Sequence, residues 1–110
     1  MARKKAELPK SIKVLGKPWR VILTESAFGT YTYGATYARE LKMEIHKDQP
    51  PLQELDTVIH ELIHVVEDTI KLEFSEKDVH GLAAGLVAIL VDNPELVEYI
   101  REKVSANTPN

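Results

Sequence analysis

The chain has 110 residues, of which 44% are hydrophobic, and this composition allows one domain with one modest core. Its formal net charge is −3, so no strong basic field argues for binding to nucleic acid. The absence of cysteine excludes a disulfide framework, a cysteine-ligated metal site and a thiol nucleophile.

No apolar run approaches the roughly 18 residues that a membrane-spanning helix needs. Residues 1–20 also lack the hydrophobic segment of a signal peptide. We therefore expect a soluble cytoplasmic protein that does not interact with a membrane. Residues 1–10 are polar, so a flexible N-terminal tail is expected before a single domain over residues 11–104.

The N-terminal half of this domain has the patterns of β-structure. Ser11 to Leu15 and Trp19 to Thr24 are rich in alternating or β-branched apolar residues, and the Gly-Lys-Pro segment between them predicts a hairpin turn. Residues 25–35 are expected to form a loop or an irregular strand. Leu41 to His46 alternate apolar and polar side chains, which is typical of a half-buried strand. We expect these strands to form a small antiparallel sheet.

A long helix is predicted from Pro51 to Ile70, because proline is favoured in a first helical turn and apolar residues recur every three or four positions. The predicted buried stripe comprises Leu52, Leu55, Ile59, Ile63, Val66 and Ile70, and it is widened by Val58, Leu62 and Val65. His60, Glu61 and His64 lie on the opposite arc of the helix. These three side chains are therefore expected to face a cleft or solvent.

Two further helices are predicted in the C-terminal part of the chain. Ser75 can cap a helix that continues to about Val91, since an acidic residue follows three positions later. An Asp-Asn-Pro segment ends that helix and starts a last one from Glu95 to about Val104. Residues 105–110 are expected to form a tail. The fold class is α+β, with the sheet packed on the long helix and on the two helices that follow.

His60, Glu61 and His64 form the motif His-Glu-x-x-His. Residues four apart lie on the same face of a helix, so both imidazoles can point at one ion, and zinc accepts histidine nitrogen at about 2.0–2.1 Å. Glu61 lies about 100° further round, where its carboxylate can take a proton from an activated water. The motif thus favours a metal-dependent hydrolase. Its uncharged, mostly apolar flanks match the longer pattern of the zinc metallopeptidases called zincins.

Two histidines need a third protein ligand, because catalytic zinc usually has three and keeps one position open. Glu67 lies on the same helix face, and His46 and Asp48 precede the helix. The start of the next helix is the better source, since a helical hairpin returns it to the motif. It offers Glu76, Asp78 and His80.

The stretch from Thr57 to Pro94 resembles the small gluzincins encoded by phages and prophages, which are related to the ImmA/IrrE group and, more distantly, to the thermolysin-like catalytic core. In that group the third ligand is a glutamate near the start of the helix after the motif. The resemblance implies a zincin-like minimal core with Glu76 as that ligand, in the cytoplasm of a bacterium or phage-infected cell. His80 is then either a hydrogen-bonding neighbour of the site or the third ligand itself.

The resemblance also implies a function. We expect a zinc metalloendopeptidase with one zinc ion per chain, held by His60, His64 and Glu76, and with Glu61 as general base. A peptide or protein substrate is expected to lie along the strand Leu41 to His46. An oxyanion donor is expected among Tyr31, Tyr33, Tyr37 and His80. The alternative is a catalytically silent, metal-stabilised protein-binding module. The oligomeric state stays open. Residual apolar surface on the last two helices could serve a dimer, but core packing is its expected use.

Overall fold

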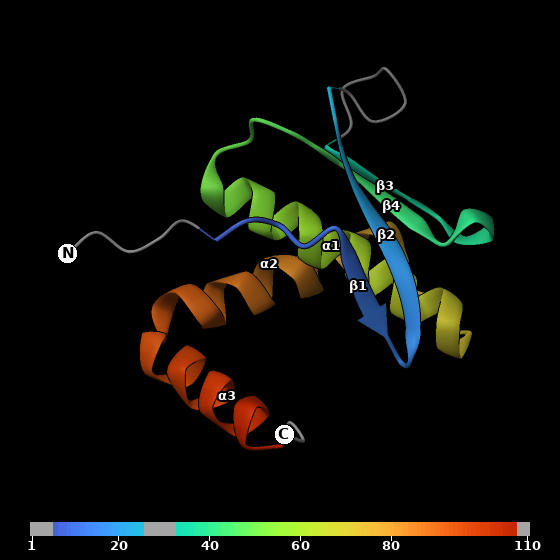
Figure 1. The fold of residues 1–110 in the computed structure, drawn as a ribbon. Helices are drawn as coiled ribbons and strands as arrows, with labels where there is room; N and C mark the ends of the chain where they lie inside the picture. The colour runs from blue at the N-terminus through green and yellow to red at the C-terminus, as the bar shows by residue number, and fades with distance from the viewer. Residues whose placement is uncertain (1–5, 26–32, 108–110) are drawn as a thin grey trace.

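A four-stranded sheet from the N-terminal half of the chain and three helices from the C-terminal half make up the fold, which confirms the α+β class (Figure 1). The computed structural model describes residues 6–25 and 33–107. The elements are β1 (Ser11–Val14), β2 (Lys17–Thr24), β3 (Gly34–Tyr37), a 3-10 turn (Ala38–Glu40), β4 (Lys42–His46), α1 (Pro51–Ile70), α2 (Glu76–Asp92) and α3 (Pro94–Ala106).

The predicted hairpin is confirmed as the antiparallel pair β1–β2. Its turn is shorter than the Gly-Lys-Pro segment, because Leu15 and Gly16 alone connect the strands, with φ angles of 49° and 86°. Two consecutive residues with positive φ give the turn the twist that matches a hairpin, and glycine takes one of them without steric cost. Pro18 lies within β2, opposite Lys13.

The sheet is mixed, so the expectation of a wholly antiparallel sheet is wrong. The strand order is β1-β2-β4-β3, in which β2 and β4 are parallel and β3 and β4 are antiparallel. A short turn over Ala38–Glu40, closed by Leu41 at a φ angle of 50°, folds β4 back on β3. Strand β4 then lies between β3 and β2, and it runs in the same direction as β2.

The main core lies between the sheet and α1. Met43 and Ile45 of β4 are fully buried, as their alternation with polar residues predicts. They pack in one cluster with Trp19 and Val21 of β2 and with Val58 and Val65 of α1. Leu8, within the predicted tail, packs against this cluster.

Helix α1 has the predicted bounds, but its buried side matches the predicted stripe only in part. Val58 and Val65 are buried as predicted, whereas Leu52 and Ile70, near the two ends, are exposed. Thr57 and Glu61, which the pattern places on the opposite arc, are buried as well. The helix contacts β3 and β4 as well as α2, so its apolar residues are divided between a side that faces the sheet and a side that faces α2.

Helix α2 begins with the predicted capping box, in which the Ser75 hydroxyl accepts from the Asp78 N–H and the Asp78 carboxylate accepts from the Ser75 N–H. Only Val79 and Ala83 of α2 are buried, and no residue of α3 is. The large hydrophobic residues exposed on these two helices are Leu82, Leu86, Ile89, Val91, Leu96, Val97, Tyr99, Ile100 and Val104. The expectation that they serve core packing is wrong.

None of the described helices alone is both long and apolar enough to cross a membrane. Helices α2 and α3 meet that criterion only when taken together, as a pair bent by 96°.

Gly34 sets how closely β3 approaches α1. A Cβ atom at this position would lie 2.7 Å from Thr57 Cγ2, 3.1 Å from Glu61 Cγ and 3.2 Å from the Glu44 carbonyl oxygen. We expect Gly34→Ala to lower the free energy of unfolding by about 1–3 kcal/mol, because the strand and helix must separate. Urea unfolding measures this loss.

The matched control is Gly81→Ala on α2, where an added Cβ meets nothing within 4 Å. This change should leave stability unaltered or raise it by up to about 1 kcal/mol, since alanine is the better helix former. Equal stability of both variants and the wild type would contradict the close approach at Gly34.

Candidate metal site

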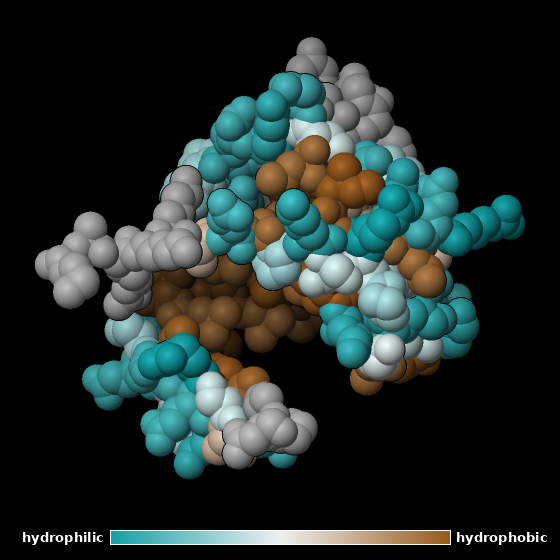
Figure 2. Space-filling model, in the orientation of Figure 1, coloured by the Kyte–Doolittle hydropathy of each residue, from teal (hydrophilic) through white to brown (hydrophobic). Residues whose placement is uncertain are grey.

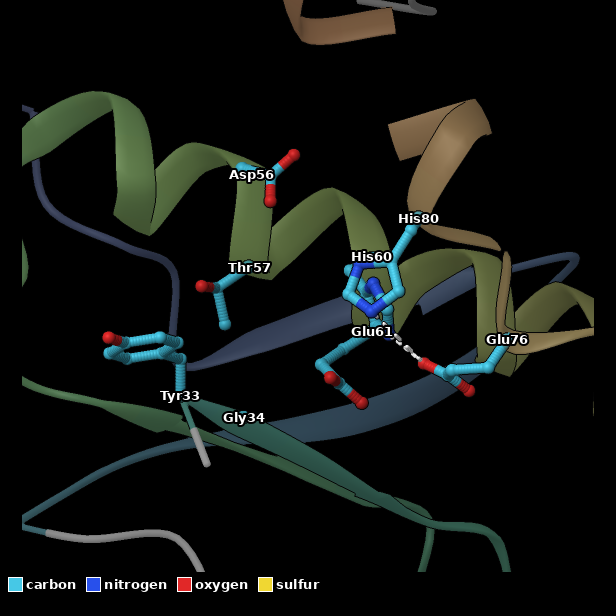
Figure 3. A pocket seen from close by; sticks show the side chains of 8 residues that line it. All are labelled: Tyr33, Gly34, Asp56, Thr57, His60, Glu61, Glu76 and His80. Atoms are coloured by element: carbon cyan, nitrogen blue, oxygen red, sulfur yellow. Dashed lines mark ion pairs between the residues drawn. The ribbon is translucent and has the colours of Figure 1, made fainter. Parts of the chain in front are cut away.

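Three potential ligands from two helices converge where the start of α2 meets the middle of α1. His60 and His64 lie one turn apart on α1, and Glu76 is the first residue of α2. Figure 3 shows His60 and Glu76 facing each other. His60 Nε2 lies 2.8 Å from Glu76 Oε1, and His64 Nε2 lies 3.6 Å from Glu76 Oε2. Both imidazoles thus direct their Nε2 atoms at one carboxylate.

This group could hold a metal ion. One ligand atom from each of His60, His64 and Glu76 lies within 4.8 Å of the others. Ligands of a tetrahedral ion with bonds of about 2.0–2.1 Å are about 3.3 Å apart, between the two nitrogen–oxygen separations observed. The three side chains are therefore close enough together to share one ion.

Glu67 supports the site from outside. Its Oε1 atom lies 2.8 Å from His64 Nδ1, and its Oε2 atom accepts a hydrogen bond of 2.8 Å from the backbone N–H of Phe74. A carboxylate at Nδ1 favours the tautomer in which Nε2 is free to bind an ion. Of the alternative ligands, Glu67 is therefore placed as a neighbour of His64. It also ties the α1–α2 connector to the end of α1.

His80 lies beside the site but outside the ligand group. Its ring packs edge-on against His60 with 4.7 Å between centroids, and its Nε2 atom is 4.0 Å from Glu76 Oε1. The side chain is 68% exposed. The geometry therefore brings Glu76, rather than His80, to the two motif histidines.

Glu61 is buried against the edge of the sheet. The side chain points from α1 toward β3 (Figure 3), and the residue is only 5% exposed. The Thr36 hydroxyl on β3 donates a hydrogen bond of 2.6 Å to Glu61 Oε1. A carboxylate held in this way has a fixed orientation beside the ligand group. The expectation that Glu61 faces a cleft is confirmed, because the residue lines one, but it is not exposed to solvent.

A cleft of about 280 Å³ joins these groups. It is lined by Tyr33, Gly34, Asp56, Thr57, His60, Glu61, Glu76 and His80. Tyr33 and Glu76 lie at opposite ends of it (Figure 3). Two of the potential ligands, His60 and Glu76, therefore share one opening with the buried Glu61 carboxylate.

The other candidate residues lie elsewhere. His46 Nδ1 contacts the carbonyl oxygen of Lys47, 2.5 Å away, and Asp78 takes part in the capping box. Neither belongs to the ligand group, and neither does Asp48.

Among the tyrosines expected as oxyanion donors, only Tyr33 lines the cleft in the described part of the chain. Tyr31 lies outside the described residues. Side chains alternate along a strand, so Tyr37 points away from α1 when Thr36 points toward it. The Tyr37 hydroxyl donates to Glu44, and burial together with the Glu44 carboxylate raises the pKa of Tyr37.

Sequence reasoning missed Thr36 and Gly34. Their contacts with Glu61 join positions 25 and 27 residues apart in the chain, so no local pattern signals them. Gly34 is the one signal of the two, because a glycine in a strand can mark a close approach of its backbone to another element.

Comparison with known proteins adds no relative, since no protein-family model, curated protein or solved structure matches this chain.

We expect the purified protein to bind about one divalent ion per chain and His60→Ala to lose it, because two remaining ligands make a weak site. Elemental analysis after gel filtration measures the stoichiometry, and the melting temperature should rise with added metal only where binding survives. His46→Ala is the matched control, since it removes a histidine outside the group.

The third ligand is tested by a second pair of variants. Glu76→Ala should weaken binding, and His80→Ala should retain the ion. The reverse pattern would show that His80 is the ligand.

Thr36→Val removes the hydroxyl donor while keeping the shape of the side chain. We expect it to lower the free energy of unfolding by about 1–3 kcal/mol, because a buried carboxylate loses a hydrogen-bond partner. Thr36→Ser, which keeps the hydroxyl, should lose less. If urea unfolding shows both variants to be as stable as the wild type, the hydrogen bond from Thr36 to Glu61 contributes nothing measurable to stability.

Proposed function

We propose that the protein is a zinc-dependent endopeptidase of the gluzincin type. The observation that carries this proposal is the buried, oriented Glu61 carboxylate beside the group of His60, His64 and Glu76. A site that only stabilises a fold has no need of an ionisable side chain buried next to its ligands. A hydrolase needs that carboxylate as a base.

The residues of the chain divide the work. His60, His64 and Glu76 would hold zinc, which when bound polarises a carbonyl and lowers the pKa of a water toward about 7. Glu61 takes a proton from the attacking water and later delivers one to the leaving amine. Thr36 keeps the Glu61 carboxylate in place through its hydrogen bond. Glu67 holds the His64 ring from the opposite side.

Tyr33 and His80 are the described residues that fit the role of oxyanion donor, since both line the cleft and carry a donor group. They lie on either side of the ligand group, and His80 already packs against His60.

The expected position of the substrate needs correction. Strand β4, which comprises most of Leu41 to His46, is paired on both sides by β2 and β3, so it offers no free edge for an added strand. The edge strand beside the cleft is β3. An extended peptide that adds to β3 would pass next to Glu61.

Glu61→Gln should reduce kcat/KM for an unfolded test protein or a fluorogenic peptide by about 10²- to 10⁴-fold, because the general base is lost. Metal content should stay unchanged, since Glu61 is not a ligand. Glu54→Gln makes the same change nearly two turns earlier on α1, and its activity should equal that of the wild type.

A wild-type protein that carries its full metal content and cleaves no peptide in a library would overturn the peptidase proposal. The metal-stabilised binding module would then be the function of this site.

A further inference from the structure

Helix α3 has an apolar stripe that is exposed in the described part of the chain. Leu96, Val97 and Ile100 fall within about 100° of the helix circumference, which is the pattern of a helix packed on a core. Each of these three is exposed by 36% or more. The acidic side chains of α3 lie on the other side of the helix. The residues that the structure describes therefore leave much of this stripe open to solvent.

Helix α2 leaves a second apolar stripe uncovered. It packs on α1 through Val79 and Ala83, whereas Leu82, Leu86 and Ile89 remain between 44% and 48% exposed. Figure 2 shows a hollow lined by hydrophobic surface between α3 and the body of the molecule. The two helices form an L bent by 96°, so both arms border one concave region.

The chain exposes more surface than is expected of a monomer of its size. The chain exposes 8514 Å², whereas a monomer of its mass exposes about 6,100 Å². The fifteen residues outside the described ranges contribute to the difference. Even if each of these fifteen residues counts as fully exposed, at about 160 Å² per residue, the 95 described residues expose about 6,100 Å², whereas a monomer of 95 residues exposes about 5,500 Å². An excess of about 600 Å² therefore remains. Each partner of a standard protein–protein interface buries about 800 Å².

We propose that α2 and α3 form a homodimer interface, in which each copy of the chain covers the apolar L of the other. A two-fold interface pairs a surface with itself, so it must bury no like charges. Residues 81–91 of α2 carry no charged side chain, and the glutamates of α3 lie opposite its stripe. Arg101 and Lys103 lie at the two borders of the stripe, where their long side chains can keep the charges in solvent. Two copies can therefore meet without burying an unpaired charge.

A partner of opposite charge has nothing to recognise on these stripes, since the exposed residues that form them are aliphatic. A membrane is also a poor occupant, because α3 has five charged residues among thirteen. A second copy is the partner that satisfies both constraints.

The test is the mass of the full chain in solution, measured by multi-angle light scattering at micromolar concentrations. The wild type should have twice the 12.4 kDa chain mass. Ile100→Glu and, separately, Leu86→Glu should return the mass to that of one chain, while circular dichroism shows unchanged helix content. Ser105→Glu adds the same charge to the other side of α3 and should remain a dimer.

If either glutamate variant loses its helices, the milder double variant Val97→Ser with Ile100→Ser replaces it, and its dimer should dissociate at a concentration at least tenfold higher. A wild type of single-chain mass would overturn the proposal, as would a dimer that withstands both glutamate variants. Single-chain mass combined with flotation on vesicles of phosphatidylglycerol and phosphatidylethanolamine would assign the surface to a membrane instead. These readouts measure mass and helix content rather than cleavage, so a failure of the dimer proposal is distinguishable from a failure of the peptidase proposal.

Discussion

The close approach of β3 to α1 is the contact on which the site depends. Gly34 has no side chain, so the strand can lie against Thr57 and the stem of Glu61. Two residues later, Thr36 reaches the Glu61 carboxylate and supplies the hydrogen bond that a buried charge requires. The sheet edge and the motif helix are therefore locked together at the residue proposed as the base. A wider spacing would leave that carboxylate without this bond and free to turn toward solvent, where its position relative to the two histidines would be lost.

The second half of the site is held by the local chemistry of a helix start. The capping box at Ser75 fixes where α2 begins, so Glu76 is its first residue. Glu76 faces the part of α1 that carries the two histidines. An acidic residue in a first turn is also favoured by the helix dipole, so the ligand position adds no electrostatic strain. Glu67 completes the arrangement, since it binds the His64 ring with one oxygen and the Phe74 backbone with the other. Glu67 thereby links the connector between α1 and α2 to His64, which is one of the potential ligands.

Local signals in the sequence predicted what local interactions determine. The bounds of α1, the capping box of α2 and the alternation in β4 all follow from turn chemistry or periodicity within one segment. The parallel pairing of β2 with β4 and the burial of Glu61 depend on which segments meet in space, so no single stretch could reveal them. The apolar stripe on α1 combines a feature set by the local pattern with one set by contacts between segments. Its periodicity correctly indicated a helix, but a helix packed on a sheet and on a second helix divides its apolar residues between two neighbours.

The weak attachment of α2 links the proposed interface to the proposed metal site. Only Val79 and Ala83 anchor α2 by full burial, yet its first residue is the proposed third ligand. A metal ion shared between His60, His64 and Glu76 would hold the start of α2 on α1, while a second copy of the chain would hold its leucine stripe. Both partners restrict the same helix, so each reduces the conformational freedom that the other must remove. Thermodynamic linkage makes this effect reciprocal: a dimer that binds metal more tightly is also a dimer that metal strengthens. The exposed stripe on α2, which has no role in the monomer, then has one in the site.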